Sequence, residues 1–235
     1  IPVPYWVSYP DMVHVAEGTP VYVDGTAQED LTLTAEALRA AITPRTRWLL
    51  LNSPSNPSGA AYSAEALEAL AAVLREHPQV MILADDIYEY LVYDGFIFHT
   101  LAQVAPDLMT RTLTVNGVSK AYAMTGWRIG YGAGPQWLIK AMSDVQSHAT
   151  SNPCSISQEA ACAALNGDHG FLETWREAFT TRRDLALKAL SAMPGVRCTK
   201  PQGAFYLFPD CSGLLGSTTP AGKPITDSMD LCQYL

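Results

Sequence analysis

The chain is 235 residues long and 48% of its residues are hydrophobic, which allows one large domain, or one domain and part of another, with a substantial core. Its 15 basic and 23 acidic residues give a net charge of −8. The basic residues form no stripe, so nucleic acids and anionic membranes are not expected as partners. An anionic ligand would need a local basic site.

The cysteines and the chain ends suggest the setting of the protein. The five cysteines are odd in number and never in CxxC spacing, which favours free thiols over a disulfide framework or a zinc site, and we expect no metal. No apolar run is long enough to span a bilayer and no signal peptide is evident, so we expect a cytoplasmic location. The chain begins without methionine at Ile1 and stops at Leu235 within a helical pattern, so we expect a piece truncated at both ends.

The first 110 residues alternate short apolar runs with helical patterns. Strands are predicted at 20–23, 48–51, 80–84 and 112–115. Helices are predicted at 33–42, with Thr34 as N-cap and Glu36 in the first turn, and from 63 to about 76. The second helix presents an apolar face made of Leu67, Leu70, Ala71 and Leu74. This alternation predicts an α/β fold, with a mostly parallel sheet covered by helices on both faces.

The remaining residues read as mainly helical. Helices are predicted from 135 to about 147, at 155–165, and from 171 to about 193. The last of these carries an apolar face made of Leu172, Trp175, Phe179, Ala186 and Leu190. Strands are expected at Val196 and at 204–208, and 210–227 is rich in loop-forming residues and predicts a mobile loop. We therefore expect a large domain over 1–170, then a linking helix and part of a smaller α/β C-terminal domain over 171–235.

Polar side chains follow three of the predicted strands. Asn56, Asp85 and Lys120 each fall just beyond the carboxyl end of an apolar strand. Ligands of parallel sheets gather at that edge. Three side chains far apart in the sequence are therefore expected to converge there.

Lys120 has the surroundings expected of a Schiff-base lysine near a bound phosphate. It ends the GVSK segment at 117–120, and the GWRIG segment at 126–130 brings Arg128 eight positions later. A lysine can form an imine with an aldehyde cofactor, a guanidinium grips phosphate oxygens in pairs, and small neighbours let the backbone approach a ligand. The alternative is a surface lysine at the start of a helix.

Five segments in order resemble one family. They are PYWVSYP at 4–10, NPSG at 56–59, DDIY at 85–88, the stretch 117–130, and SNP at 151–153. Together they resemble the class I aminotransferases, the fold-type I pyridoxal-phosphate enzymes, and are closest to bacterial aspartate and prephenate aminotransferases. The resemblance covers essentially the whole chain, although Asp86 stands where a glutamate is usual.

The resemblance implies pyridoxal 5′-phosphate as cofactor and Lys120, Asp85 and Tyr88 as catalytic residues. Lys120 would hold the cofactor as a Schiff base and, once released, move a proton from the substrate Cα. Asp85 would keep the pyridine nitrogen protonated, although an aspartate after a strand also serves as a helix N-cap. Tyr88 would donate to the phenolic oxygen of the cofactor, although such a tyrosine is otherwise a core residue.

The resemblance adds three further cofactor-binding residues. Asn56 would share the phenolic oxygen and touch the substrate carboxylate, where turn asparagines ordinarily serve the local backbone. Arg128 would bind the phosphate, with a surface ion pair as the alternative. Trp6 would stack on the pyridine face and border the substrate, with ordinary core packing as the alternative.

Two positions depart from the family pattern. Gly117 stands where many relatives have a serine whose hydroxyl meets the phosphate, so Arg128, backbone and Ser119 would carry more of that contact. Ser147 stands where one branch has an arginine for the distal substrate carboxylate, which leaves dicarboxylate selection to another residue.

The resemblance implies a homodimeric aminotransferase that transfers the amino group of aspartate, or a similar amino acid, to a 2-oxo acid such as 2-oxoglutarate. A prephenate or aromatic aminotransferase, a C–S β-lyase, and a binding or regulatory module with the same fold are the alternatives. The family's N-terminal phosphate loop and C-terminal carboxylate-binding arginine have no match here. Residues 1–235 alone are therefore expected to bind the cofactor weakly and to transaminate poorly.

Overall fold

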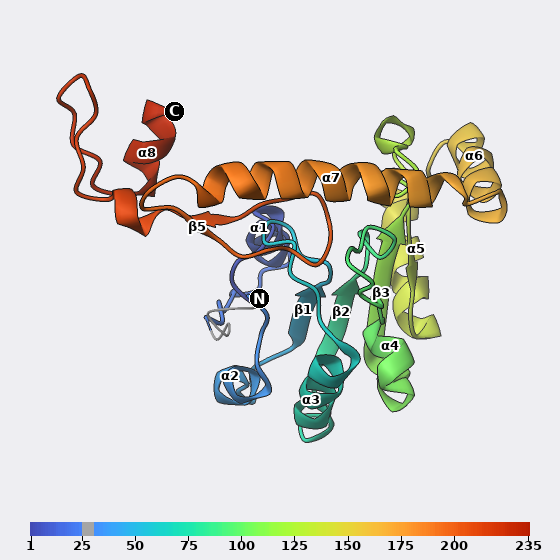
Figure 1. The fold of residues 1–235 in the computed structure, drawn as a ribbon. Helices are drawn as coiled ribbons and strands as arrows, with labels where there is room; N and C mark the ends of the chain where they lie inside the picture. The colour runs from blue at the N-terminus through green and yellow to red at the C-terminus, as the bar shows by residue number, and fades with distance from the viewer. Residues whose placement is uncertain (25–30) are drawn as a thin grey trace.

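The computed structural model describes residues 1–24 and 31–235. Its centre is a four-stranded sheet in the order β1-β2-β3-β4 (Figure 1). β1 (Trp48–Asn52), β2 (Met81–Asp85) and β3 (Thr112–Gly117) are parallel, which confirms the three predicted apolar strands. β4 (Gly130–Ala133) is antiparallel to β3 and was not predicted, because its glycine-rich and exposed residues carry no apolar pattern.

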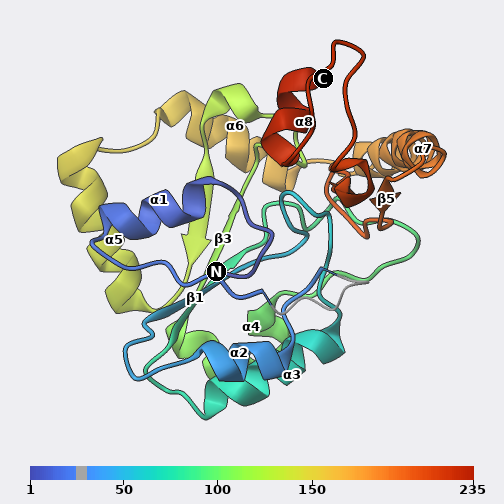
Figure 2. The same ribbon diagram turned by 90° about the vertical axis from the view of Figure 1, so that its left-hand side faces the viewer.

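β1 and β2 pack side chains on both faces of the sheet, because successive strand residues point in opposite directions. On one face, Leu49 and Leu51 of β1 and Ile82 of β2 join the large core beneath α2 (Ala35–Ala41), α3 (Ala64–Arg75) and α4 (Leu101–Val104). On the other face, Leu50 packs with Tyr9 of α1 (Ser8–Val15). Figure 2 shows α1 and α5 (Gln136–Ala149) on this side of the sheet and α2, α3 and α4 on the opposite side.

Helix boundaries follow their capping residues. The Thr34 side chain accepts a hydrogen bond from the Ala37 amide at the start of α2, and Ser63 accepts one from Ala66 at the start of α3. The predicted apolar face of α3 is fully buried, and Leu70 and Leu74 have no exposed surface. Local sequence therefore sets these two helices as predicted.

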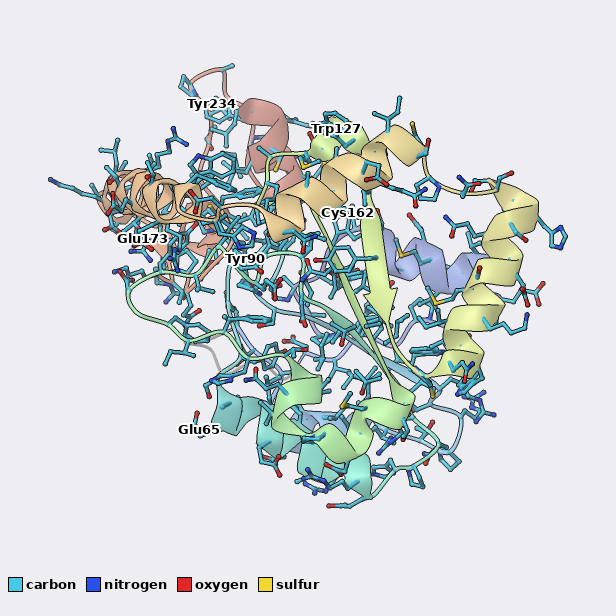
Figure 3. The ribbon with its side chains drawn as sticks, turned by 90° about the vertical axis from the view of Figure 1, so that its right-hand side faces the viewer. Glu65, Tyr90, Trp127, Cys162, Glu173 and Tyr234 are labelled. Carbon is cyan, nitrogen blue, oxygen red and sulfur yellow. The ribbon has the colours of Figure 1, made fainter. Side chains whose placement is uncertain are left out.

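The second half consists of α5, α6 (Ser155–Asn166) and the long α7 (Phe171–Ser191), as predicted within a few residues. α7 lies across the top of the sheet in Figure 1. Tyr90, from the turn after β2, lies close to the start of α7 (Figure 3), with its ring 6.2 Å from the rings of Tyr122 and His169. The predicted apolar face of α7 is only partly correct, because Leu172 is buried but Ala186 is exposed.

The chain ends in short elements. β5 (Arg197–Cys198) and β6 (Pro209–Asp210) form an antiparallel pair, and α8 (Ser228–Tyr234) follows. The described residues also form the 3-10 turns η1 (Pro106–Arg111), η2 (Thr125–Trp127) and η3 (Ser212–Leu214). The five cysteines are free thiols. Within the described ranges, no helix combines the length and apolarity needed to cross a bilayer.

Two predicted strands are wrong. Within the described residues, the run 20–23 forms a single bridge, from Val23 to Pro2, in place of a strand. The run 204–208 is a bend in which Ala204 has a φ of +56°. Its backbone bonds to the loops after β1 and β2 instead, since the Gly203 amide donates to the Gly59 carbonyl and the Ala204 amide donates to the Leu91 carbonyl. A run of apolar residues looks the same in the sequence whether it pairs as a β-strand or packs as a bend against other loops, so apolarity alone cannot distinguish the two.

Candidate functional site

Asp85 ends β2 at the carboxyl edge of the sheet. It is in register with Asn52 of β1 and Val115 of β3. No helix follows it, so it is not a helix N-cap; one carboxylate oxygen accepts from the Ile87 amide at 3.2 Å within a turn. The other accepts from the Tyr9 hydroxyl at 2.7 Å. Burial raises the pKa of Asp85 above its ordinary value, and these two hydrogen bonds partly oppose that rise.

Tyr88 is buried three residues after Asp85. Its hydroxyl oxygen lies 2.6 Å from the hydroxyl oxygen of Tyr206. Burial is the largest cause that raises the pKa of Tyr88, followed by Tyr206, and a hydrogen bond from the Asn56 side chain acts in the opposite direction. The backbone N–H of Asn56 donates to the Asn52 side-chain oxygen Oδ1 at 2.7 Å, which holds the loop in place. Asn56 and Tyr88, from the loops after β1 and β2, therefore lie close enough for the Asn56 side chain to act on the Tyr88 hydroxyl.

Lys120 lies in the turn directly after β3, between β3 and η2, so it is not at the start of a helix. Its Nζ is 5.8 Å from the centroid of the Tyr88 ring and 5.7 Å from that of Phe205. The amine thus lies beside the phenol that Asn56 contacts. The structure brings the ends of β1, β2 and β3 together at one amine-bearing site.

Gly117 is explained by packing. A Cβ added at this position would lie 2.9 Å from the Ile129 carbonyl oxygen and 3.2 Å from the Gly130 Cα. Real Cβ atoms are essentially never found as close as 2.9 Å to another atom. The backbone is this close because β3 and β4 pair at Gly117 and Gly130. A serine side chain would need a backbone shift here.

Arg128 and Trp6 are more exposed to solvent than the other predicted site residues. Arg128 is exposed, has a φ of +58°, and donates from Nη1 to the Thr125 carbonyl at 3.0 Å. Trp6 keeps 37% of its surface exposed and meets the Tyr9 ring edge-on at 5.4 Å, which is not the environment of a core residue. No contact in the described part of the chain joins the Arg128 guanidinium to Lys120 or Asp85, so the structure does not bring Arg128 to the other predicted residues.

Charge is uneven around the site. Among residues 1–24 and 31–235, neither Lys120 nor Arg128 forms an ion pair. Next to Asp85, the buried Asp86 has its pKa raised to about 7, chiefly by burial and further by Glu89 and Asp85. Lys120 and Arg128 are therefore two positive charges with which an anionic ligand could pair.

Sequence analysis missed three residues of the site. Tyr9 lies in the same segment as Trp6, and its spacing on α1 gave no reason to single it out. Phe205 and Tyr206 fell within the wrongly predicted strand 204–208, and only the docking of that bend onto the sheet brings them to Tyr88 and Lys120. No local signal in the sequence marks such a long-range contact.

Known proteins resemble this chain in sequence and in fold. The sequence profile of the family "Aminotransferase class I and II" matches residues 1–235. The crystal structure of the aspartate aminotransferase from Rhizobium meliloti is 60% identical, superposes with a TM-score of 0.97, and is matched over 100% of this chain and 58% of that one. An aspartate aminotransferase from Thermus thermophilus, solved with maleate, is 42% identical with a TM-score of 0.85, over 98% of this chain and 62% of that one.

A probable aspartate/prephenate aminotransferase from Rickettsia bellii is 56% identical over all 235 residues, which cover 59% of its length. The chain thus spans less than two thirds of each of these relatives. The family match extends from the first residue to the last, and it agrees with the sheet topology and with the motif order. On this evidence, the chain belongs to the aminotransferase class I and II family.

Proposed function

We propose that this chain is the cofactor-binding part of an aminotransferase that moves an amino group from aspartate, or a similar amino acid, to a 2-oxo acid such as 2-oxoglutarate. The observation that carries the proposal is the Lys120 amine beside Tyr88, at the sheet edge where Asp85 ends β2. The relatives at 60% and 42% identity are named aspartate aminotransferases, which supports the donor.

The residues present fit pyridoxal 5′-phosphate. Its aldehyde, phenolic oxygen, pyridine nitrogen and phosphate call for an amine, hydrogen-bond donors, a carboxylate and a cation. Lys120, the Asn56–Tyr88 pair, Asp85 and Arg128 are such a set. When bound, this cofactor supplies a ring that accepts the electrons left on the substrate Cα after its proton is removed.

Lys120 is the proposed acid–base residue. It would hold the cofactor covalently and, once the substrate replaces it, its amine would take the proton from the substrate Cα and return it on the cofactor side. In the described structure the Lys120 amine lies near the Tyr88 and Phe205 rings and forms no ion pair with a carboxylate.

Asp85 is proposed to hold the proton on the pyridine nitrogen. A carboxylate can do this only while it is ionised, and burial works against ionisation. The Tyr9 hydroxyl, 2.7 Å from Asp85, opposes this by stabilising the charged form. We propose Tyr9 as a positioning residue, because its single bond also fixes which way the carboxylate faces.

Asn56, Trp6 and Arg128 complete the proposed site. Asn56 would share the phenolic oxygen with Tyr88 and reach the substrate carboxylate, and the exposed Trp6 would cover the ring face and border the substrate. Arg128 would bind the phosphate by turning its exposed guanidinium away from the Thr125 carbonyl.

The distal carboxylate of the substrate remains without a proposed partner. Ser147 is exposed on α5, and its hydroxyl donates to the Asp144 carbonyl at 2.8 Å, so it has the environment of a helix surface residue. The Thermus relative was solved with maleate, a dicarboxylate, which supports a dicarboxylic donor. The name of the Rickettsia relative favours prephenate as a second acceptor.

The wider arrangement is proposed on the same basis. We propose pyridoxal-phosphate binding by a large domain over 1–170, with 171–235 as linking helix and part of the smaller domain, and a cytoplasmic homodimer as the working form. The substrates are small amino and 2-oxo acids.

Absorbance of the native full chain tests the function. The expected result is a near-visible cofactor band that shifts on adding aspartate and returns with 2-oxoglutarate, and that is absent from Lys120→Ala. A parallel panel of prephenate, aromatic amino acids and cystathionine ranks the alternatives. Pyruvate and ammonia from cystathionine, without amino transfer, would identify a C–S β-lyase instead. A native chain with no band would contradict the proposal.

A further inference from the structure

Residues 201–206, which lead into and include the bend at Ala204, form several hydrogen bonds with the loops after β1 and β2. The Gly203 amide donates to the Gly59 carbonyl at 2.9 Å, beside the Asn56 loop. The Ala204 amide donates to the Leu91 carbonyl at 2.8 Å, and the Tyr93 hydroxyl donates to the Ala204 carbonyl. These bonds connect a segment from the end of the chain to the loops after β1 and β2.

Residues 201–206 pack tightly against the loop that carries Asn56, with no room for a side chain at Gly59 or Gly203. A Cβ at Gly59 would lie 2.4 Å from the Pro201 Cβ, and one at Gly203 would lie 2.5 Å from the Pro54 Cγ. The two surfaces therefore meet only because both positions are glycine. The Asn56 loop and the bend are held in one fixed relation.

An ion pair between the buried Arg183 of α7 and the half-exposed Asp94 supports the same bend. Arg183 is almost fully buried and binds Asp94 through two nitrogens, at 2.8 and 3.0 Å. Its Nη1 also donates to the Pro201 carbonyl at 3.2 Å, and its guanidinium carbon lies 4.9 Å from the centroid of the Tyr93 ring. In Figure 1 this segment, coloured orange after β5, passes beneath α7 toward the edge of the sheet.

These contacts position two aromatic side chains, Phe205 and Tyr206, at the site. Phe205 reaches the Lys120 amine, and the Tyr206 hydroxyl meets the Tyr88 hydroxyl at 2.6 Å with the two rings edge-on. A phenol has one proton to donate. Either hydroxyl can be the donor in this pair, and the raised pKa of Tyr88 corresponds to Tyr88 donating to Tyr206. When Tyr88 instead gives its proton to a ligand, the direction reverses and Tyr206 donates to the Tyr88 oxygen.

We infer that Tyr206 is a positioning residue that acts through Tyr88: its hydroxyl donates to the Tyr88 oxygen and makes Tyr88 a stronger donor to the phenolic oxygen of the cofactor. This inference rests on the proposed function. Hydrogen bonds in a chain polarise one another, so a bond donated to Tyr88 strengthens the bond that Tyr88 donates. The ionised phenolic oxygen is thereby stabilised, and the nitrogen of the Lys120–cofactor link loses its proton at a lower pH.

The test is a pH titration of the cofactor absorbance in the native full chain, with Tyr206→Phe compared with wild type. Removing the hydroxyl while keeping the ring is expected to raise the apparent pKa of the band by about 0.5 unit, a fraction of what one hydrogen bond is worth. The cofactor dissociation constant, measured by fluorescence, is expected to rise by about threefold.

Two further variants separate the specific effect from a general one. Tyr122→Phe removes another interior hydroxyl, 3.3 Å from His169, and is expected to leave the band pKa unchanged. Tyr206→3-fluorotyrosine carries a more acidic hydroxyl, donates more strongly, and is expected to lower the band pKa. Thermal unfolding of each variant checks that the fold is retained.

The outcomes are distinct. Opposite shifts for Tyr206→Phe and Tyr206→3-fluorotyrosine support the inference, and a structural role of Tyr206 would not produce them. An unchanged band pKa in both variants, or a shift in the same direction in both, overturns it. A wild-type chain without a cofactor band would refute the proposed function itself, which is a separate result.

Discussion

Asp86 offers a test of electrostatics that needs no cofactor. The side chain is 4% exposed and its pKa is raised from 3.8 to about 7, chiefly by burial. Because the folded chain holds this proton more tightly than the unfolded chain, the group costs stability as pH rises from about 4 to 7 and the cost is constant above that. Asp86→Asn removes the ionisation and should remove this dependence.

The magnitude follows from the two pKa values. The cost is about 2 kcal/mol at pH 5 and about 4 kcal/mol at pH 8, so it grows by roughly 2 to 3 kcal/mol over this range. Any fixed effect of the asparagine on packing cancels in this difference. The free energy of unfolding of Asp86→Asn, relative to wild type, is therefore expected to increase by roughly 2 to 3 kcal/mol between pH 5 and pH 8.

Urea unfolding of the cofactor-free chain at pH 5, 6, 7 and 8 measures this quantity. The matched control is Asp144→Asn, which removes a carboxyl that is 62% exposed and pairs with Lys140 on the surface of α5. That variant should show little change with pH. If the relative stability of Asp86→Asn were the same at pH 5 and pH 8, burial would not be controlling this carboxyl and the reasoning would be wrong.

Three further changes test separate parts of the structure. Tyr9→Phe removes the donor to Asp85 and should raise the pKa of that carboxyl further and weaken cofactor binding about tenfold, as fluorescence titration would register; unchanged binding would exclude Tyr9 as a positioning residue. Gly59→Ala places a Cβ within 2.4 Å of Pro201 at a φ of +69°, so the free energy of unfolding should fall by more than about 1 kcal/mol. Residues 201–206 should also be cleaved faster by proteases, and a wild-type digestion pattern would contradict their packing against Gly59. Leu70→Ala, in the centre of the α3 core, should cost about 3 kcal/mol in urea unfolding, and a loss below about 1 kcal/mol would show that the core adjusts.

Sequence alone determined the elements whose signal is local. The apolar runs of β1, β2 and β3, and the capped, one-sided pattern of α3, were read correctly because burial of their own side chains dictates the conformation. Once these strands were read as parallel, the ends of neighbouring strands had to share one edge. That is why Asn56, Asp85 and Lys120 could be predicted to converge.

Tertiary structure decided the contacts that no periodicity encodes. β4 forms from a glycine-rich stretch because β3 offers it a free edge, and the run 204–208 bends instead of extending because its amides find partners at Gly59 and Leu91. Tyr9 and Tyr206 reach the site through folding that joins residues 76 and 118 positions apart. A hydrogen bond between distant segments depends on where the whole chain places two atoms, and local spacing carries no record of that position.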